Sequence, residues 1–167
     1  MYKTEAIITK VENFKENHLS ISVYSSEYGQ KSLVVFGGKS KKKNSTYVKG
    51  SLNNIEFDNN NVCLSSTSIN KFKWFLFSKY ELKTIDYFCF LINKLLFLAD
   101  QNTNVISYYL LLISKLNERS NYLPEFLLLE LEILKASGYQ PDLNESVLKK
   151  IFNFHEKKNL KTYELIY

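Results

Sequence analysis

The sequence has few of the residues that form metal sites, flexible linkers and breaks in regular structure. Among 167 residues there are two Cys, two His, two Pro and five Gly. Gly and Pro are too scarce for a collagen-like or low-complexity chain. Cys63 and Cys89 lie in apolar stretches with no Cys-x-x-Cys or His-x-x-x-His pattern nearby. We therefore expect two buried thiols of a reduced compartment, and no metal or other cofactor.

Segments that would direct the chain to a membrane are also missing. The longest apolar stretch, near Phe88–Ala99, is interrupted by Asn93 and Lys94. It is too short and too polar to cross a bilayer. The opening Met1–Glu5 carries an acid and leads into no apolar core of a signal peptide. We expect a cytoplasmic protein with no membrane partner.

None of the common catalytic patterns occurs. The sequence has no Gly-x-Ser-x-Gly, no His-Glu-x-x-His and no paired carboxylates. Gly38-Lys39-Ser40 lacks the rest of a phosphate-binding P-loop. His18 is next to a predicted turn and His155 is on an amphipathic segment, so both are interpreted as surface residues. The prediction is a protein that is not an enzyme and has no catalytic residue.

Positive charge is concentrated in the first half of the chain. The net charge is +5, and residues 1–77 hold eleven Lys against six acidic residues. Residues 78–167 are balanced, with ten Lys and one Arg against eleven acidic residues. A basic module next to a neutral one favours a polyanionic partner. The alternative is a chance excess, because five charges over 77 residues is modest.

The first 70 residues have the period-two pattern of strands. We expect strands at Thr4–Val11, Leu19–Tyr24, Lys31–Phe36, Leu52–Phe57 and Val62–Ser68. Gly29 suits the turn between the second and third, because glycine tolerates positive φ. Five short strands in about 70 residues predict a small closed β-barrel, the five-stranded OB-fold.

After residue 70 the apolar spacing becomes helical. We expect helices at Lys79–Leu98, Val105–Leu116, Tyr122–Ser137 and Ser146–Glu156. Pro124 suits a first turn, and Gly138 follows the end of that helix. The predicted fold class is therefore α+β, with an OB-fold over residues 1–72 and a helical bundle over residues 73–167.

A basic loop is the main candidate site. Gly37–Asn44 contains four Lys in five positions, which must face solvent and can neutralise phosphates. Tyr24, Tyr28 and Tyr47 are nearby candidates for stacking on bases. The predicted DNA-binding set is Lys10, Lys15, Lys39, Lys41, Lys42, Lys43, Lys49, Tyr24 and Tyr47. The alternative is a solvated loop with no partner.

Five motifs in order resemble one family. They are Tyr2–Ile8 with Glu16–Leu19, Tyr28-Gly29 with Phe36–Lys41, Lys49–Leu52, Leu129–Leu134 with Gly138–Leu143, and Leu160–Leu165. Together they resemble RecO, a bacterial recombination mediator, over nearly the whole chain. The stretch with Gly138-Tyr139-Gln140-Pro141 is the most specific.

This resemblance implies a function that needs no nucleotide and no covalent step. It implies a bacterial, nucleoid-associated protein that binds single- and double-stranded DNA and anneals complementary strands. It also implies contact with the C-terminal tail of single-strand-binding protein (SSB), and work with RecR to load RecA.

The sequence departs from the family pattern at three points. Many relatives insert a four-cysteine zinc ribbon after the Gly-Tyr signature, whereas here Asn144 leads almost directly into the last predicted helix. Relatives often carry Arg where this chain has Leu127 and Leu128, and Arg positions of the barrel are Lys or lost. These departures leave open a protein-interaction scaffold that binds DNA weakly. A nucleic-acid enzyme is disfavoured by the lack of clustered metal ligands.

Overall fold

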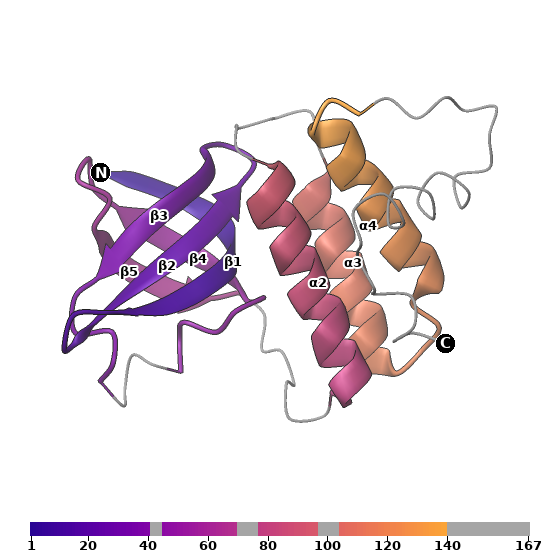
Figure 1. The fold of residues 1–167 in the computed structure, drawn as a ribbon, viewed down its shortest axis with the longest axis horizontal. Helices are drawn as coiled ribbons and strands as arrows, with labels where there is room; N and C mark the ends of the chain where they lie inside the picture. Colours follow the sequence, from indigo (N-terminus) through magenta and orange to yellow (C-terminus); the bar gives the residue numbers. More distant parts are fainter. Residues whose placement is uncertain (41–44, 70–76, 97–103, 140–167) are drawn as a thin grey trace. The chain divides into compact units, whose positions relative to one another are not determined.

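The computed structural model describes residues 1–40, 45–69, 77–96 and 104–139 (Figure 1). In chain order its elements are β1 (Tyr2–Phe14), β2 (His18–Ser25), β3 (Gly29–Val35), β4 (Leu52–Phe57), β5 (Cys63–Ser68), α2 (Lys79–Leu95), α3 (Val105–Glu118) and α4 (Leu123–Ala136). Five antiparallel strands precede three helices, so the α+β prediction is confirmed.

The strands form one antiparallel sheet in the order β3-β2-β1-β4-β5. The first half of β1 pairs with β4 and its second half with β2. Figure 1 shows the sheet strongly curled. A single parallel bridge between Val34 and Val62 joins its two edges, and Val34 N–H donates to the Asn61 carbonyl at 2.9 Å. Within the described ranges the edges therefore meet at one bridge, rather than along the continuous ladder that a fully closed barrel would have.

A β-bulge in β1 allows this long strand to serve two partners. Ile8 pairs with Val23 and Lys10 with Ser22, so Thr9 between them has no partner on β2. Such a bulge bends its strand and increases the local twist. The strand predicted at Thr4–Val11 extends further in both directions, as β1 at Tyr2–Phe14. The bend at the bulge contributes to the curl of the sheet.

One face of the sheet forms an apolar core, as the alternating pattern predicts. Its buried members are Ala6, Ile8, Leu19, Ile21, Val23, Leu33, Val35, Tyr47, Ile55, Phe57 and Cys63. Burial of such side chains contributes about 1.5–3 kcal/mol each. Cys63 and Cys89 are both buried thiols, which confirms their predicted burial.

The helices begin and end close to their predicted residues. Pro124 lies in the first turn of α4, and Gly138 after its end has φ of +83°. At the start of α2, the Ser78 hydroxyl accepts the Glu81 N–H while the Glu81 carboxylate accepts the Ser78 N–H. This reciprocal pair is a capping box. No helix in the described ranges is long and apolar enough to span a bilayer. The predicted helix at Ser146–Glu156 lies outside these ranges.

Contacts divide the chain into two compact units, each described by itself below. The sheet unit is Met1–Phe72 with Cys89–Asn102, and the helical unit is Lys73–Phe88 with Thr103–Tyr167. The second part of α2 thus groups with the sheet. The predicted division into an OB-fold over residues 1–72 and a helical domain over residues 73–167 stays a prediction.

The helical unit is held by an aromatic cluster. The Phe126 ring stacks on Tyr87 at 5.8 Å and meets Phe88 edge-on at 4.9 Å. The Tyr87 hydroxyl donates to the carboxylate of Glu130, which is fully buried. A buried carboxylate needs such a donor to offset its lost hydration.

Candidate nucleic-acid interface

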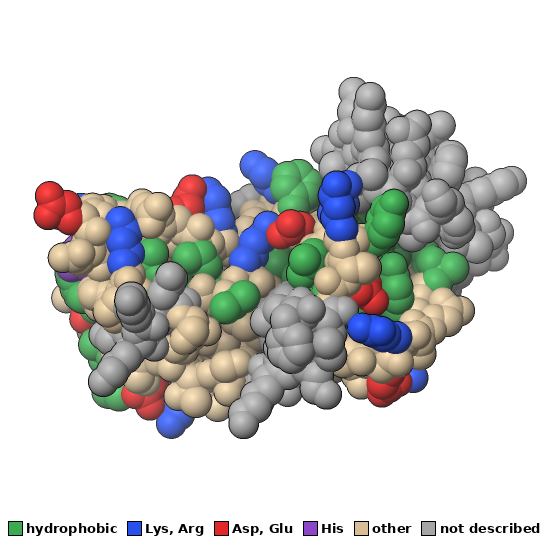
Figure 2. All heavy atoms as spheres, turned by 90° about the horizontal axis from the view of Figure 1, so that it is seen from below, with side chains coloured by type: hydrophobic (Ala, Val, Ile, Leu, Met, Phe, Trp, Pro, Cys, Tyr) green, Lys and Arg blue, Asp and Glu red, His purple; other side chains and the backbone are tan. Residues whose placement is uncertain are grey.

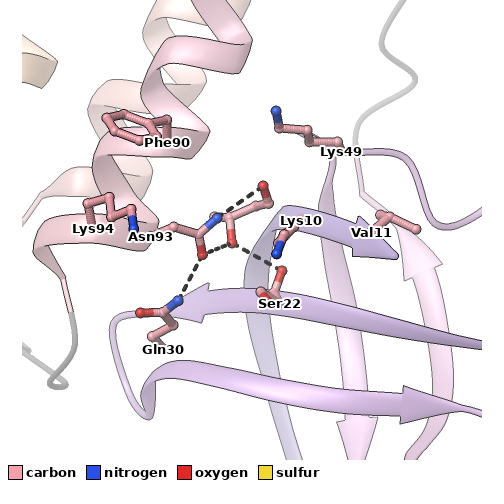
Figure 3. Close-up of a pocket in the computed structure, with 9 residues that line it drawn as sticks. Lys10, Val11, Ser22, Gln30, Lys49, Phe90, Asn93 and Lys94 are labelled. Atoms are coloured by element: carbon pink, nitrogen blue, oxygen red, sulfur yellow. Dashed lines mark hydrogen bonds between the residues drawn. The ribbon is translucent and has the colours of Figure 1, made fainter. Parts of the chain in front are cut away.

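The sheet unit contains a hollow of about 480 Å³ bordered by cations (Figure 3). Its lining residues are Thr9, Lys10, Val11, Ser22, Gln30, Lys49, Phe90, Asn93 and Lys94. The described residues of this lining include three ammonium groups and no acid. Lys10 forms an ion pair with Glu12 at 2.8 Å, in which both side chains are about half exposed. Because exposed pairs are weak, Lys10 remains able to exchange this partner for a phosphate.

A hydrogen-bond network on Asn93 forms the floor of the hollow. Figure 3 shows Asn93 projecting from α2 toward the strands. Its Oδ1 accepts from Gln30 Nε2 at 2.8 Å and from the Thr9 hydroxyl at 2.7 Å, and its Nδ2 donates to the Thr9 carbonyl at 3.2 Å. The bulge removes Thr9 from the ladder, and Asn93 satisfies the carbonyl that the bulge frees.

A second group of cations and rings lies at the end of the sheet where β1 turns into β2. Lys39 Nζ donates to the Lys15 carbonyl at 2.8 Å, which brings together two predicted lysines from separate loops. Lys15 Nζ lies 5.5 Å from the centre of the Phe14 ring. Phe14 and Phe36 are 39% and 53% exposed, respectively. Exposed rings beside ammonium groups are what single-stranded nucleic acid requires.

His18 fixes the start of the basic loop. Its Nδ1 accepts the Gly37 N–H at 3.2 Å, and its ring meets Phe36 edge-on at 4.8 Å. Gly37 has φ of +64°, a conformation that glycine adopts without strain. These contacts hold the chain where it enters the basic segment. Lys41, Lys42 and Lys43, which we predicted to bind DNA, lie outside the described ranges.

Two predicted stacking residues need correction. Tyr24 is fully buried, and Tyr47 is 8% exposed with its hydroxyl 3.9 Å from Cys63 Sγ. Burial raises the pKa of the Tyr47 phenol. Neither ring offers a face to a base. Tyr24 pairs across the ladder with Ile7, which is also fully buried, so the second face of the sheet is covered there. The period-two pattern had predicted that this face is exposed.

The residues that sequence reasoning missed are Phe14, Phe36 and Lys94. Phe36 was counted in the predicted strand Lys31–Phe36 and Phe14 was in no predicted strand, yet both rings are exposed at the sheet's end. Lys94 belongs to the half of the chain that we judged neutral. The only signal for it was the polar interruption Asn93-Lys94 in an apolar stretch.

The helical unit has its own hollow, of about 440 Å³. Phe77, Ser78, Glu81, Arg119, Ser120 and Tyr122 line it. Arg119 caps α3 in the left-handed conformation, with φ of 54°. Two further cations of the helical unit are ion-paired: Lys115 with Glu118 at 3.3 Å and Lys135 with Glu132 at 3.8 Å.

Charges of both signs are mixed on one face of the molecule. On the face drawn in Figure 2, cationic and acidic side chains alternate over the described residues, and no large area of one sign appears. Two local groups of cations stand out in the sheet unit: Lys10, Lys49 and Lys94 at the hollow around Asn93, and Lys15 with Lys39 at the β1–β2 end.

The fold defines an OB-type β-domain followed by a helical segment. Residues 1–68 match the family model described as "Recombination protein O N terminal". This part of the chain is therefore a RecO N-terminal domain. The match ends with β5. Proteins of this family are generally mediators rather than enzymes. No curated protein matches the chain significantly.

Proposed function

We propose that this protein binds single- and double-stranded DNA, anneals complementary strands and works with RecR to load RecA onto SSB-coated DNA. One observation carries the proposal: Lys15, Lys39, Phe14 and Phe36 converge at one end of a RecO N-terminal domain. The three further lysines at positions 41–43 follow directly in the chain.

Annealing requires mainly that two polyanions approach each other. Lysines that neutralise phosphates lower the repulsion between the strands and release counterions. The exposed rings of Phe14 and Phe36 can hold unpaired bases in a sequence-tolerant way. Neither step needs a nucleotide or a covalent intermediate.

Work on SSB-coated DNA needs a second contact, to the acidic and aromatic tail of SSB. We propose Arg119 as the cation for this tail, because it borders a hollow with Phe77 and Tyr122. Glu81 borders the same hollow and opposes an acidic peptide. Loss of the family Arg at Leu127 or Leu128 then makes tail binding weaker than in Arg-bearing relatives.

A second candidate function is a protein-interaction scaffold that binds DNA weakly. The mixed surface charge of Figure 2 and the Lys10–Glu12 ion pair favour this candidate. The two candidates differ in whether the sheet unit acts on naked strands.

The test is the annealing rate of complementary oligonucleotides, bare and coated with SSB. We expect the protein to accelerate annealing of bare strands and, more weakly, of coated strands. The test variant has Lys15 and Lys39 changed to Gln. Its matched control has Lys79 and Lys83 on α2 changed to Gln. Equal rates with and without protein on bare strands would favour the scaffold.

A further inference from the structure

Three aromatic rings gather at the other end of β1 from the basic loop. Tyr2 stacks on Phe57 with ring centres 5.2 Å apart, and Tyr28 meets both rings edge-on at 5.5 Å. Tyr2 begins β1, Phe57 ends β4, and Tyr28 comes just before β3. Phe57 is 3% exposed but Tyr2 is 39% exposed, so the cluster is anchored in the core and open on one side.

The open side faces a hollow of about 460 Å³. Its lining residues are Tyr2, Tyr28, Lys31, Phe57, Asp58, Asn59 and Asn61. The Asp58 Oδ1 atom is engaged by its own turn, since it accepts the N–H groups of Asn60 and Val62 at 2.9 and 2.8 Å. Asn59 and Asn61 are exposed and offer amide groups.

Among the described residues, Lys31 is the only cation lining this hollow. It forms no ion pair with any described residue. The hollow thus combines aromatic rings, amides and an ammonium group that pairs with no acid of the described ranges. Its size falls within the range of small-molecule pockets, about 300–1,000 Å³.

We propose that this hollow receives one unpaired base of single-stranded nucleic acid, stacked on Tyr2, with the adjoining phosphate at Lys31. The inference rests on the proposed DNA binding and adds a second, base-contacting site to it. Rings accept any base because every base has a π-face. Bases inside a duplex are already stacked on their neighbours, so this site distinguishes single strands from duplexes.

The position of β3 connects this site with the basic loop. Lys31 lies on β3, and Phe36 and Lys39 follow it in the chain. A strand that enters at Tyr2 can therefore follow β3 toward Phe36.

The experiment measures binding of the full chain, without a tag, to three fluorescein-labelled probes. These are (dT)15, the same length of abasic deoxyribose phosphate, and a duplex of equal length. The variants are Tyr2→Ala and Tyr2→Phe, with Tyr80→Ala as the matched control because Tyr80 is 59% exposed on α2. We expect Tyr2→Ala to weaken (dT)15 binding by at least about fivefold, the lower bound for loss of one base–aromatic stack.

We further expect Tyr2→Phe and Tyr80→Ala to bind (dT)15 with the wild-type affinity. On the abasic probe, and likewise on the duplex probe, wild type and all three variants should have the same affinity. An unchanged (dT)15 affinity in Tyr2→Ala, or an equal loss on the abasic probe, overturns the stacking site while DNA binding stands. No binding of any probe by wild type overturns the proposed function as well. If Tyr2→Ala does not fold by circular dichroism, Tyr2→Leu replaces it, since leucine keeps an apolar side chain without a ring.

Discussion

Gly37 and Gly38 are adjacent in the chain, but different constraints require each glycine. Gly37 has φ of +64°, and a Cβ there would meet no atom within 4 Å. A Cβ on Gly38 would lie 2.9 Å from Leu19 Cγ and 3.1 Å from Val35 Cγ1. The first position is limited by backbone conformation and the second by close packing against the core.

Side-chain replacement separates these two constraints. We expect Gly37→Ala to lower the free energy of unfolding by about 1–2 kcal/mol, and Gly37→Asn to cost less because Asn tolerates positive φ. Gly38→Ala should cost about 1–3 kcal/mol through overpacking, and Gly38→Asn more than that. Urea unfolding of the four variants gives the values. The interpretation fails if Asn is the better replacement at position 38 as well.

Burial of Tyr47 makes the free energy of unfolding decrease at alkaline pH. Burial raises the pKa of this phenol above its ordinary value of 10. Its stabilising contribution is therefore complete below pH 10. As pH rises from 10 toward the folded pKa, the unfolded chain loses a proton that the folded one keeps. Stability then falls, by up to about 1.4 kcal/mol per pH unit.

We predict that Tyr47→Phe makes this alkaline decrease shallower, because phenylalanine has no proton to release. Urea unfolding at pH 9, 10 and 11 measures the difference between variant and wild type. Tyr80→Phe is the control, since Tyr80 is exposed on α2. Parallel pH curves for Tyr47→Phe and wild type would contradict the burial argument.

At the scale of elements, the link between α2 and the sheet depends on Asn93. Its side chain contacts the Thr9 carbonyl, the Thr9 hydroxyl and Gln30. We expect Asn93→Ala to lower the free energy of unfolding by about 1–3 kcal/mol, because buried groups of the bulge lose their partner. Asn117→Ala on the exposed side of α3 is the control, and should change stability by less than about 0.5 kcal/mol. A loss for Asn93→Ala no larger than the control's would contradict this role.

The sequence allowed the elements to be predicted well, because their patterns are local. The predicted strand Leu52–Phe57 matches β4, and capping and Pro signals place the ends of α4 within a residue. The bulge at Thr9 was not predictable, since it depends on two partner strands and on Asn93, 84 positions away in the chain. Tyr24 was misplaced for the same reason: burial on the second face of a sheet comes from distant segments.

At the scale of the whole molecule, charge arithmetic indicated the basic half of the chain but not the arrangement of its cations. Lys15 and Lys39 meet only because two loops converge. Lys94 joins Lys10 and Lys49 only because part of α2 groups with the sheet. Long-range contacts thus decide which charges act together, and composition cannot supply them.

The helical unit carries a prediction about partner binding. We expect an SSB tail peptide to bind this protein more weakly than it binds Arg-bearing relatives. The difference in binding free energy, measured by calorimetry, should be about 1–3 kcal/mol for one lost charge-assisted hydrogen bond. Arg119→Ala should weaken it further. Lys135→Ala should not, because Lys135 is paired with Glu132. Equal affinity of Arg119→Ala and wild type would remove Arg119 from the proposed tail site.

The most direct test of the central claim, DNA binding by the basic loop, is the salt dependence of single-stranded DNA affinity. Replacing Lys39, Lys41, Lys42 and Lys43 by Gln should reduce the slope of log K against log salt by up to about 2.8, at about 0.7 per lost phosphate contact. The control replaces Lys79, Lys83, Lys115 and Lys135 by Gln, which changes net charge equally, and should leave the slope nearly unchanged. An equal slope in the loop variant and wild type would contradict the account.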